Sequence, residues 1–217
     1  MDNKKYKTEI IKNRKAQSDF FVKVVFMGDL KVGKTSLVKK LIGNKFEEDY
    51  NPTNGYEFKK YLIKVNGTII KFQIWDMSGD ENYRPNVIRL YRNAQMGILV
   101  YSICSRESFN NLENWIIQMK SHSPTSKIFL LGNKSDLGGK REVSYEEGKN
   151  IYEKYKLDFF KEINAIDNFT SPNFMEIGAI SIYKDYENNI NNASISNINE
   201  SIMLIDDRSE RRENCCI

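Results

Sequence analysis

The sequence predicts an α/β protein in which a mostly parallel sheet carries helices on both faces. Short apolar runs alternate with segments of helical periodicity along most of the 217-residue chain. Such alternation is typical of parallel strands joined by crossover helices. One pair of alternating segments instead flanks Asn66-Gly67, a dipeptide that favours a tight β-hairpin. One antiparallel edge strand is therefore expected beside the parallel ones.

The elements follow one another in a simple order. The first strand is expected in "FFVKVVFM" and the first helix in "KTSLVKKLIG", with glycines between them. The hairpin occupies "YEFKKYLIKVNGTIIKFQIWD". Three later apolar runs, "GILVYSI", "KIFLLGN" and "LDFFKEI", lead into the helical segments "SFNNLENWIIQMK", "SYEEGKNIYEKY" and "SPNFMEIGAISIYKDY".

The two ends of the chain differ from this core, which is expected to span residues 19–187. Residues 1–18 carry six Lys or Arg against two acids and are predicted to form a basic, flexible extension. Residues 188–217 are rich in asparagine and carry five acids against three arginines, so a flexible tail is predicted. A short helix docked on the core is the alternative for this tail.

Composition excludes several classes of protein. Hydrophobic residues make up 40% and charged residues 29%, which is ordinary for a soluble domain. The net charge of +4 is too small to indicate nucleic acid as a partner. No apolar run reaches the roughly 18 residues of a membrane span. Three cysteines, two of them adjacent, do not make a disulfide framework and suit a reducing, cytosolic compartment.

The stretch "GDLKVGKT" matches the eight-residue phosphate-binding loop, and it lies between a predicted strand and a predicted helix. Backbone N–H groups of such a loop, with the helix N-terminus, surround a polyphosphate. Lys34 can reach the β- and γ-phosphates, and the Thr35 hydroxyl can bind Mg²⁺. The nucleotide contacts expected in this stretch are Gly28, Asp29, Leu30, Lys31, Val32, Gly33, Lys34, Thr35 and Ser36.

The stretch "NKSD" indicates which base is bound. It follows an apolar run, so Asn133, Lys134 and Asp136 are expected at the carboxyl end of a strand, where ligands bind in such sheets. A fixed carboxylate can accept hydrogen bonds from N1–H and the 2-amino group of guanine. Adenine lacks this pair of donors and would leave the acid unpaired.

Two further stretches suit the metal and the terminal phosphate. In "WDMSG", Asp76 ends a strand and could hold Mg²⁺ through water, and the Gly79 N–H could reach a γ-phosphate. The Thr53 hydroxyl could complete the metal shell when a triphosphate is bound. Taken alone, Thr53 would be a turn residue after Pro52, and Trp75 would equally suit a core position.

Together these motifs resemble the Ras superfamily of small GTPases, specifically its Rab branch, over about residues 20–186; "KFQIWD" and "SFNNLENW" add to the resemblance. The resemblance implies a P-loop NTPase fold, the small G domain, with six strands and about five helices, and GTP or GDP with Mg²⁺ as ligands. This chain has "NAI", Asn164, Ala165 and Ile166, where the family has "SAK": the Ala165 N–H can still approach the guanine oxygen, but the lysine that supports the base is missing. The resemblance also implies an effector-facing apolar triad of Phe58, Trp75 and Leu90.

The chain departs from the family at the residue that orients the attacking water. The family pattern is "WDTAGQE", whereas this chain has "WDMSGDE", so Asp80 replaces the glutamine. An ionised carboxylate only accepts hydrogen bonds, whereas an amide also donates. Leu30 and Lys31 also occupy positions that are usually small. Lys34 is retained as a catalytic residue, but slow GTP hydrolysis is expected unless Glu81 or an activating protein supplies the missing group.

The chain ends in "NCCI", where Cys215 and Cys216 resemble the Rab signal for double geranylgeranylation. Two prenyl chains give stable membrane anchoring where one is marginal. The resemblance implies an escort protein and a prenyltransferase acting on the tail, and an exchange factor, an activating protein and effectors at the switch regions. A monomer is expected, on the cytosolic face of an endomembrane or the plasma membrane, with a soluble escort-bound pool.

Two other functions compete with a GTP/GDP switch in vesicle traffic. A scaffold that holds GTP with almost no hydrolysis would share every nucleotide-binding motif. A metabolic nucleotide kinase would share only the phosphate loop, and "NKSD" and the paired terminal cysteines argue against it.

Overall fold

A seven-stranded sheet in the order β1-β3-β4-β2-β5-β6-β7 forms the centre of the protein. The computed structural model describes residues 6–13, 16–43, 53, 55–79, 88–166 and 173–190. Within these ranges every pairing is parallel except the two made by β3. The strands are β1 Thr8–Ile11, β2 Phe20–Met27, β3 Tyr56–Val65, β4 Thr68–Met77, β5 Met96–Ser102, β6 Lys127–Asn133 and β7 Phe159–Glu162. The predicted α/β fold class is confirmed.

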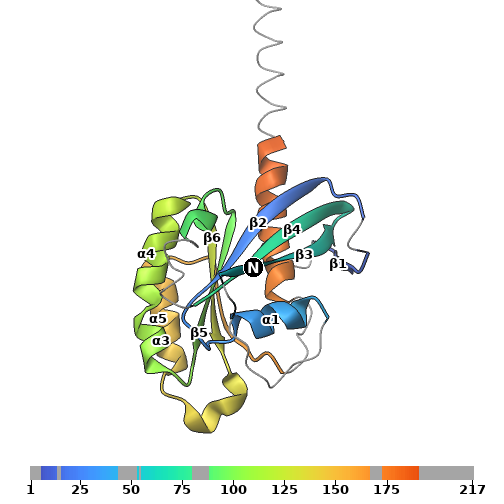
Figure 1. The fold of residues 1–217 in the computed structure, drawn as a ribbon. Helices are drawn as coiled ribbons and strands as arrows, with labels where there is room; N and C mark the ends of the chain where they lie inside the picture. The colour runs from blue at the N-terminus through green and yellow to red at the C-terminus, as the bar shows by residue number, and fades with distance from the viewer. Residues whose placement is uncertain are drawn as a thin grey trace, which may run out of the picture.

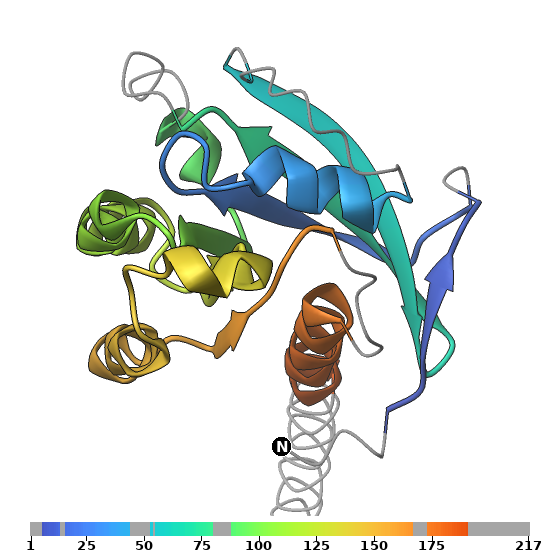
Figure 2. The same ribbon diagram turned by 90° about the horizontal axis from the view of Figure 1, so that it is seen from below.

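Helices cover both faces of the sheet, as Figures 1 and 2 show. α1 (Lys34–Leu41) and a helix over residues 174–190 pack on one face, in a cluster that includes Leu37 and Phe174. α3 (Arg106–Asn110), α4 (Leu112–His122) and α5 (Tyr145–Tyr155) pack on the other. No helix among these described residues is long and apolar enough to cross a membrane.

The β3–β4 hairpin forms where the sequence predicts it. Asn66 and Gly67 both have positive φ, 48° and 99°, as a two-residue turn that matches the twist of the strands requires. Side chains alternate along β4, where Ile70, Phe72 and Ile74 are fully buried. β5 is buried at all seven positions because β2 and β6 flank it and helices cover it.

β1 is the main departure from the predicted fold. Thr8–Ile11 pairs antiparallel with the far half of β3, from Val65 to Leu62, so this segment is a seventh strand and not part of a flexible extension. The Thr8 hydroxyl also donates to the Glu176 carboxylate at 2.8 Å. The edge of β3 presents unpaired backbone groups, and a neighbouring strand satisfies them. The basic composition of residues 1–18 hides this pairing because its partners lie far along the chain.

The helix over residues 174–190 begins at a side-chain cap. The Asn173 amide oxygen accepts from the N–H groups of Met175 and Glu176 at 2.9 and 3.0 Å, and the Glu176 carboxylate accepts from the Asn173 N–H at 2.9 Å. The helix continues past the predicted boundary at residue 188 to residue 190. Tyr186 stacks on Phe20 at 4.7 Å between ring centroids, which ties this helix to the start of β2.

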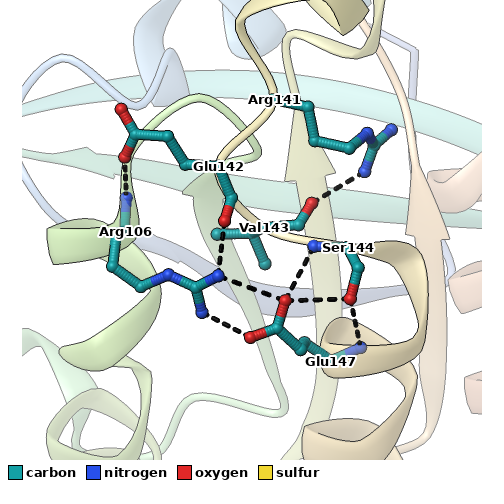
Figure 3. A network of polar contacts seen from close by, with 6 residues as sticks. All are labelled: Arg106, Arg141, Glu142, Val143, Ser144 and Glu147. Atoms are coloured by element: carbon teal, nitrogen blue, oxygen red, sulfur yellow. Dashed lines mark hydrogen bonds and ion pairs between the residues drawn. The ribbon is translucent and has the colours of Figure 1, made fainter.

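A polar network joins α3 to the start of α5 (Figure 3). Arg106 donates to both carboxylate oxygens of Glu147, at 2.5 and 3.2 Å, and to the carbonyl of Glu142. Ser144 caps α5 by accepting from the Glu147 N–H, and Glu147 accepts from the Ser144 N–H in return. This network fixes the segment that leads into α5. In the sequence, that segment follows the predicted base-binding stretch.

Candidate functional site

The phosphate loop lies between β2 and α1, in the strand–loop–helix setting that the sequence predicts. Gly28, Lys31 and Gly33 have φ of 129°, 63° and 99°. A Cβ atom at Gly28 would lie 2.1 Å from the Val100 carbonyl oxygen. Glycine is therefore needed at Gly28 both for its backbone conformation and for its close approach to β5.

Lys34 lies inside this loop and is only 6% exposed. Its ammonium donates to the carbonyl oxygens of Gly28 and Asp29 at 2.9 and 2.7 Å. Burial lowers the pKa of Lys34 to about 8, and the negative charges of Asp76 and Asp29 partly oppose this shift. A buried cation at the N-terminus of a helix suits an anionic ligand.

The three predicted metal ligands divide into a pair of hydroxyls and a buried acid. The Thr35 and Thr53 hydroxyl oxygens lie 2.9 Å apart. Asp76 is 1% exposed, and neither carboxylate oxygen accepts a hydrogen bond of regular geometry from the described part of the chain. Burial raises the pKa of Asp76 to about 6, although the Thr35 hydroxyl and the Lys34 charge act to lower it.

These three residues fit a magnesium ion. Mg²⁺ prefers hydroxyl, carboxylate and water oxygens, and a cation would stabilise the buried charge of Asp76. No group of three or more His, Cys, Asp or Glu that could hold a metal occurs within the described ranges. Thr35, Thr53 and Asp76 could together offer two hydroxyls and a carboxylate to such an ion.

Gly79 lies directly against the phosphate loop. A Cβ atom at this position would come within 2.3 Å of the Asp29 carbonyl carbon and 2.4 Å of the Leu30 nitrogen. Any larger side chain at Gly79 would push the loop aside. The predicted contact of its N–H with a γ-phosphate is compatible with this location.

The "NKSD" stretch follows β6 and also touches the phosphate loop. Asn133 is 2% exposed, and its side-chain amide donates to the Val32 carbonyl at 2.8 Å. Lys134 has φ of 67° and precedes the 3₁₀ helix η4 (Ser135–Lys140), in which Asp136 is exposed. Asn133 thus links the stretch after β6 to the phosphate loop, whereas the Asp136 side chain is exposed.

The loop after β7 approaches the same place. The Ser135 N–H donates to the Ile163 carbonyl at 3.2 Å, and Lys40 of α1 donates to the Ile166 carbonyl at 2.9 Å. Asn164 accepts from the Ile166 N–H at 3.1 Å, and Ala165 is 6% exposed. The structure therefore brings the loops after β2, β6 and β7 together at the carboxyl ends of parallel strands.

Two members of the predicted effector-facing triad touch each other. Phe58 is 39% exposed, and its ring lies 5.1 Å from that of Trp75, which is partly buried. Leu90, in the 3₁₀ helix η3 (Ile88–Tyr91), packs on the same apolar cluster as Trp75. Tyr56, 51% exposed, also lies 5.1 Å from Trp75. Sequence reasoning missed Tyr56, although its spacing of two from Phe58 places both on one sheet face.

The side-chain partners of Asp29 were also missed. Asn111 and Trp115 both donate to its carboxylate. They lie 82 and 86 residues away in the sequence, so no local signal reveals them. The predictions for Asp80, Cys215 and Cys216 concern positions outside the described ranges.

Comparison with known proteins identifies the family. The Ras family model matches residues 23–180. The chain is 39% identical over 153 residues to the Ras-related protein RABA6b of Arabidopsis thaliana, covering 70% of this chain and 66% of that protein, just under two thirds of its length. It is 37% identical over 158 residues to the Ras-related protein Rab-11A of Dictyostelium discoideum, covering 72% and 73%. It is 32% identical over 213 residues to the Ras-related protein RABA5e of Arabidopsis thaliana, covering 92% and 95%. The chain therefore belongs to the Ras family and, within the Ras superfamily of small GTPases, to the Rab branch.

Proposed function

We propose that this protein is a Rab-type GTP/GDP switch that acts on membranes in vesicle traffic and hydrolyses GTP slowly. The observation that carries the proposal is the contact between the Thr35 and Thr53 hydroxyls, 2.9 Å apart beside the buried Asp76. Thr35 belongs to the phosphate loop and Thr53 to the segment between α1 and β3. A metal and phosphate site that includes Thr53 can therefore alter that segment when the terminal phosphate is lost.

The residues of the chain take distinct parts in holding nucleotide. Thr35, Thr53 and Asp76 would hold Mg²⁺, which when bound would supply charge neutralisation for the phosphates. Lys34 leaves the carbonyls of Gly28 and Asp29 to bind phosphate oxygens, and the N–H groups of the loop complete the cradle. Asp136 selects guanine.

Slow hydrolysis follows from the chemistry of Asp80. Catalysis of phosphoryl transfer rests mainly on positioning and charge stabilisation. A carboxylate at this position brings negative charge toward an already anionic γ-phosphate and donates no hydrogen bond. Leu30, 41% exposed, adds bulk where the catalytic arginine of an activating protein would enter. That arginine accelerates hydrolysis about 10³–10⁵-fold in related enzymes. Hydrolysis by this protein is therefore expected to respond only weakly to an activating protein.

The rate of hydrolysis separates this proposal from a GTP-holding scaffold. Single-turnover hydrolysis would be measured for the unmodified protein, for Asp80→Gln and for Asp80→Gln with Leu30→Ser, each with and without a Rab activating protein. The switch proposal expects slow but measurable hydrolysis that both variants accelerate. Hydrolysis by the unmodified protein as fast as by the variants would show that Glu81 or the activating protein supplies the function. No hydrolysis under any condition favours the scaffold.

The nucleotide that the protein carries in its own cells gives an independent test. Slow hydrolysis with active exchange predicts that mainly GTP is recovered from protein isolated rapidly in the presence of Mg²⁺. Recovery of adenine nucleotides, or of none, would contradict the proposed base selectivity.

A further inference from the structure

Asp29, the second residue of the phosphate loop, is bound through its side chain by two donors from the start of α4. The Asn111 amide donates to Oδ2 and the Trp115 indole N–H donates to Oδ1, each at 2.7 Å. Asn111 immediately precedes α4 and Trp115 lies four residues later, so both reach the loop from one face of the helix. Each carboxylate oxygen therefore has its own neutral donor.

The two hydrogen bonds bear on the negative charge of Asp29 beside the phosphate loop. A carboxylate next to a polyphosphate site repels the ligand, and this repulsion is weaker when the carboxylate is held pointing away from the site. Hydrogen bonds to an ionised acceptor are short and strong, which agrees with the two distances at Asp29. Trp115 is 2% exposed and packed in the core around α4, so the position of its N–H is set by packing. The charge of Asp29 is thereby held toward α4.

The backbone of Asp29 is confined on its other side. Its carbonyl accepts from the Lys34 ammonium at 2.7 Å. Gly79 lies so close that a Cβ atom there would be 2.3 Å from the Asp29 carbonyl carbon. Asp29 is thus the point at which the start of α4, Lys34 and Gly79 meet.

We propose that Asp29 is a positioning residue of the nucleotide site, through which Asn111 and Trp115 fix the phosphate loop and so prolong retention of the nucleotide. The proposal rests on the proposed function, because it takes the ligand to be GDP or GTP with Mg²⁺. A loop held in its binding conformation loses less conformational entropy when ligand binds. Releasing Asp29 lets the loop and its lysine move apart from the phosphates.

The test measures release of nucleotide from the full chain. The protein is loaded with fluorescently labelled GDP and Mg²⁺ and then chased with excess unlabelled GDP. Trp115→Phe removes the N–H donor while keeping most of the ring, and Asn111→Ala removes the other donor at a half-buried position. Each is expected to accelerate release about tenfold, the scale of one lost hydrogen bond to a charged group.

A matched control separates this role from general damage to α4. Glu113→Ala changes the same helix but removes contacts with Lys154, at 2.6 Å, and Tyr155 of α5, away from Asp29, so release should stay at the unmodified rate. Unfolding midpoints of the loaded proteins are measured in parallel. A role in folding alone would lower the midpoint of Trp115→Phe and Asn111→Ala without changing release.

A double-mutant cycle shows whether Trp115 acts through Asp29. If it does, Asp29→Ala combined with Trp115→Phe releases nucleotide no faster than Asp29→Ala alone. If the two substitutions multiply in their effects on GDP release, or if the single variants release GDP at the unmodified rate, the positioning role is overturned. The proposed function would still stand. If the unmodified chain retains no labelled GDP, the proposed function itself fails and this proposal falls with it.

Discussion

We propose that base selectivity rests on a single exposed side chain, Asp136. The residue lies in η4 just after β6, and Asn133 anchors the start of this stretch to the phosphate loop at 2.8 Å. We expect this anchor to position Asp136, whose negative charge and two acceptor oxygens would then decide which base binds. Selectivity at this site is therefore expected to change with one atom of one residue.

Asp136→Asn should weaken GTP binding and improve binding of xanthosine triphosphate. The 2-oxo group of xanthine needs a donor where the 2-amino group of guanine needs an acceptor, and an amide supplies that donor. Competition binding with the two nucleotides measures the change. An unchanged preference would place the base elsewhere, and Asn133, which is buried between the loops, is unsuitable as a control.

At the scale of elements, β1 and the helix over residues 174–190 depend on each other. The Thr8 hydroxyl donates to Glu176, which is 3% exposed, and the Tyr6 ring lies 6.0 Å from that of Tyr183. Together with the β1 pairing, these contacts cover the edge of β3 from Leu62 to Val65. The half of β3 nearest the nucleotide site, with Phe58, remains uncovered by β1.

Thr8→Val should destabilise the protein by about 1–3 kcal/mol, since it removes a donor to a buried carboxylate and keeps the β-branched shape. Urea unfolding of the Mg²⁺ and GDP-loaded protein measures the loss, and amide exchange of Leu62 to Val65 should rise with it. Thr8→Ser keeps the hydroxyl and should restore most of the stability. Equal stability of Thr8→Val and the unmodified protein would show that backbone pairing alone holds β1.

The link between α3 and α5 should depend on pH. The pKa of Glu147 is lowered from 4.5 to about 2, first by Arg106 and then by the Ser144 N–H and hydroxyl (Figure 3). A carboxylate whose pKa falls on folding stabilises the fold above its unfolded pKa. That stabilisation is lost as pH falls from about 4.5 toward about 2.

Glu147→Gln should therefore make the unfolding free energy depend less on pH between about 4.5 and about 2. Unfolding free energies of the variant and the unmodified protein should differ at about pH 6 and converge as the pH approaches about 2. Glu146→Gln removes the same charge one residue away, outside the network in Figure 3, and serves as the control. A constant difference across the range would mean that Glu147 contributes through packing and not through its charge.

At the scale of the whole molecule, the ligand loops gather at one end of the sheet, where the strands present their carboxyl ends. The helix over residues 174–190 instead runs along the face of the sheet that α1 also covers, and leads the chain away from these loops (Figure 1). Cys215 and Cys216 follow this helix in the sequence, and the helix contains none of the proposed nucleotide-site residues. Membrane attachment and nucleotide binding should accordingly be separable by mutation.

Cys215→Ser with Cys216→Ser should move the protein to the soluble fraction of its own cells, whereas either single change should release part of it. One prenyl chain anchors marginally and two anchor stably. Fractionation measures the distribution, and labelled GDP binding should be unchanged in all three variants. Retention of the double variant on membranes would point to the basic residues at the N-terminus.

The sequence by itself determined the elements that rest on local rules. Gly28 and Gly33 adopt the positive φ values that the phosphate loop needs, and Asn66-Gly67 forms the turn between β3 and β4. Each conformation depends on the residue and its immediate neighbours, so pattern and spacing suffice to predict it. The alternation of strands and helices likewise predicts the order of layers around the sheet.

Only the tertiary structure decided the contacts between residues far apart in the chain. Thr8 and Glu176 are 168 positions apart, and Asp29 and Trp115 are 86 apart. Neither pair follows a period or a spacing, because each depends on where two separately formed elements meet after packing. β1 pairs with the edge of β3 and contacts the helix over residues 174–190, so its partners lie on elements far along the chain. The Asp29 carboxylate likewise receives its two donors only when α4 packs beside the phosphate loop.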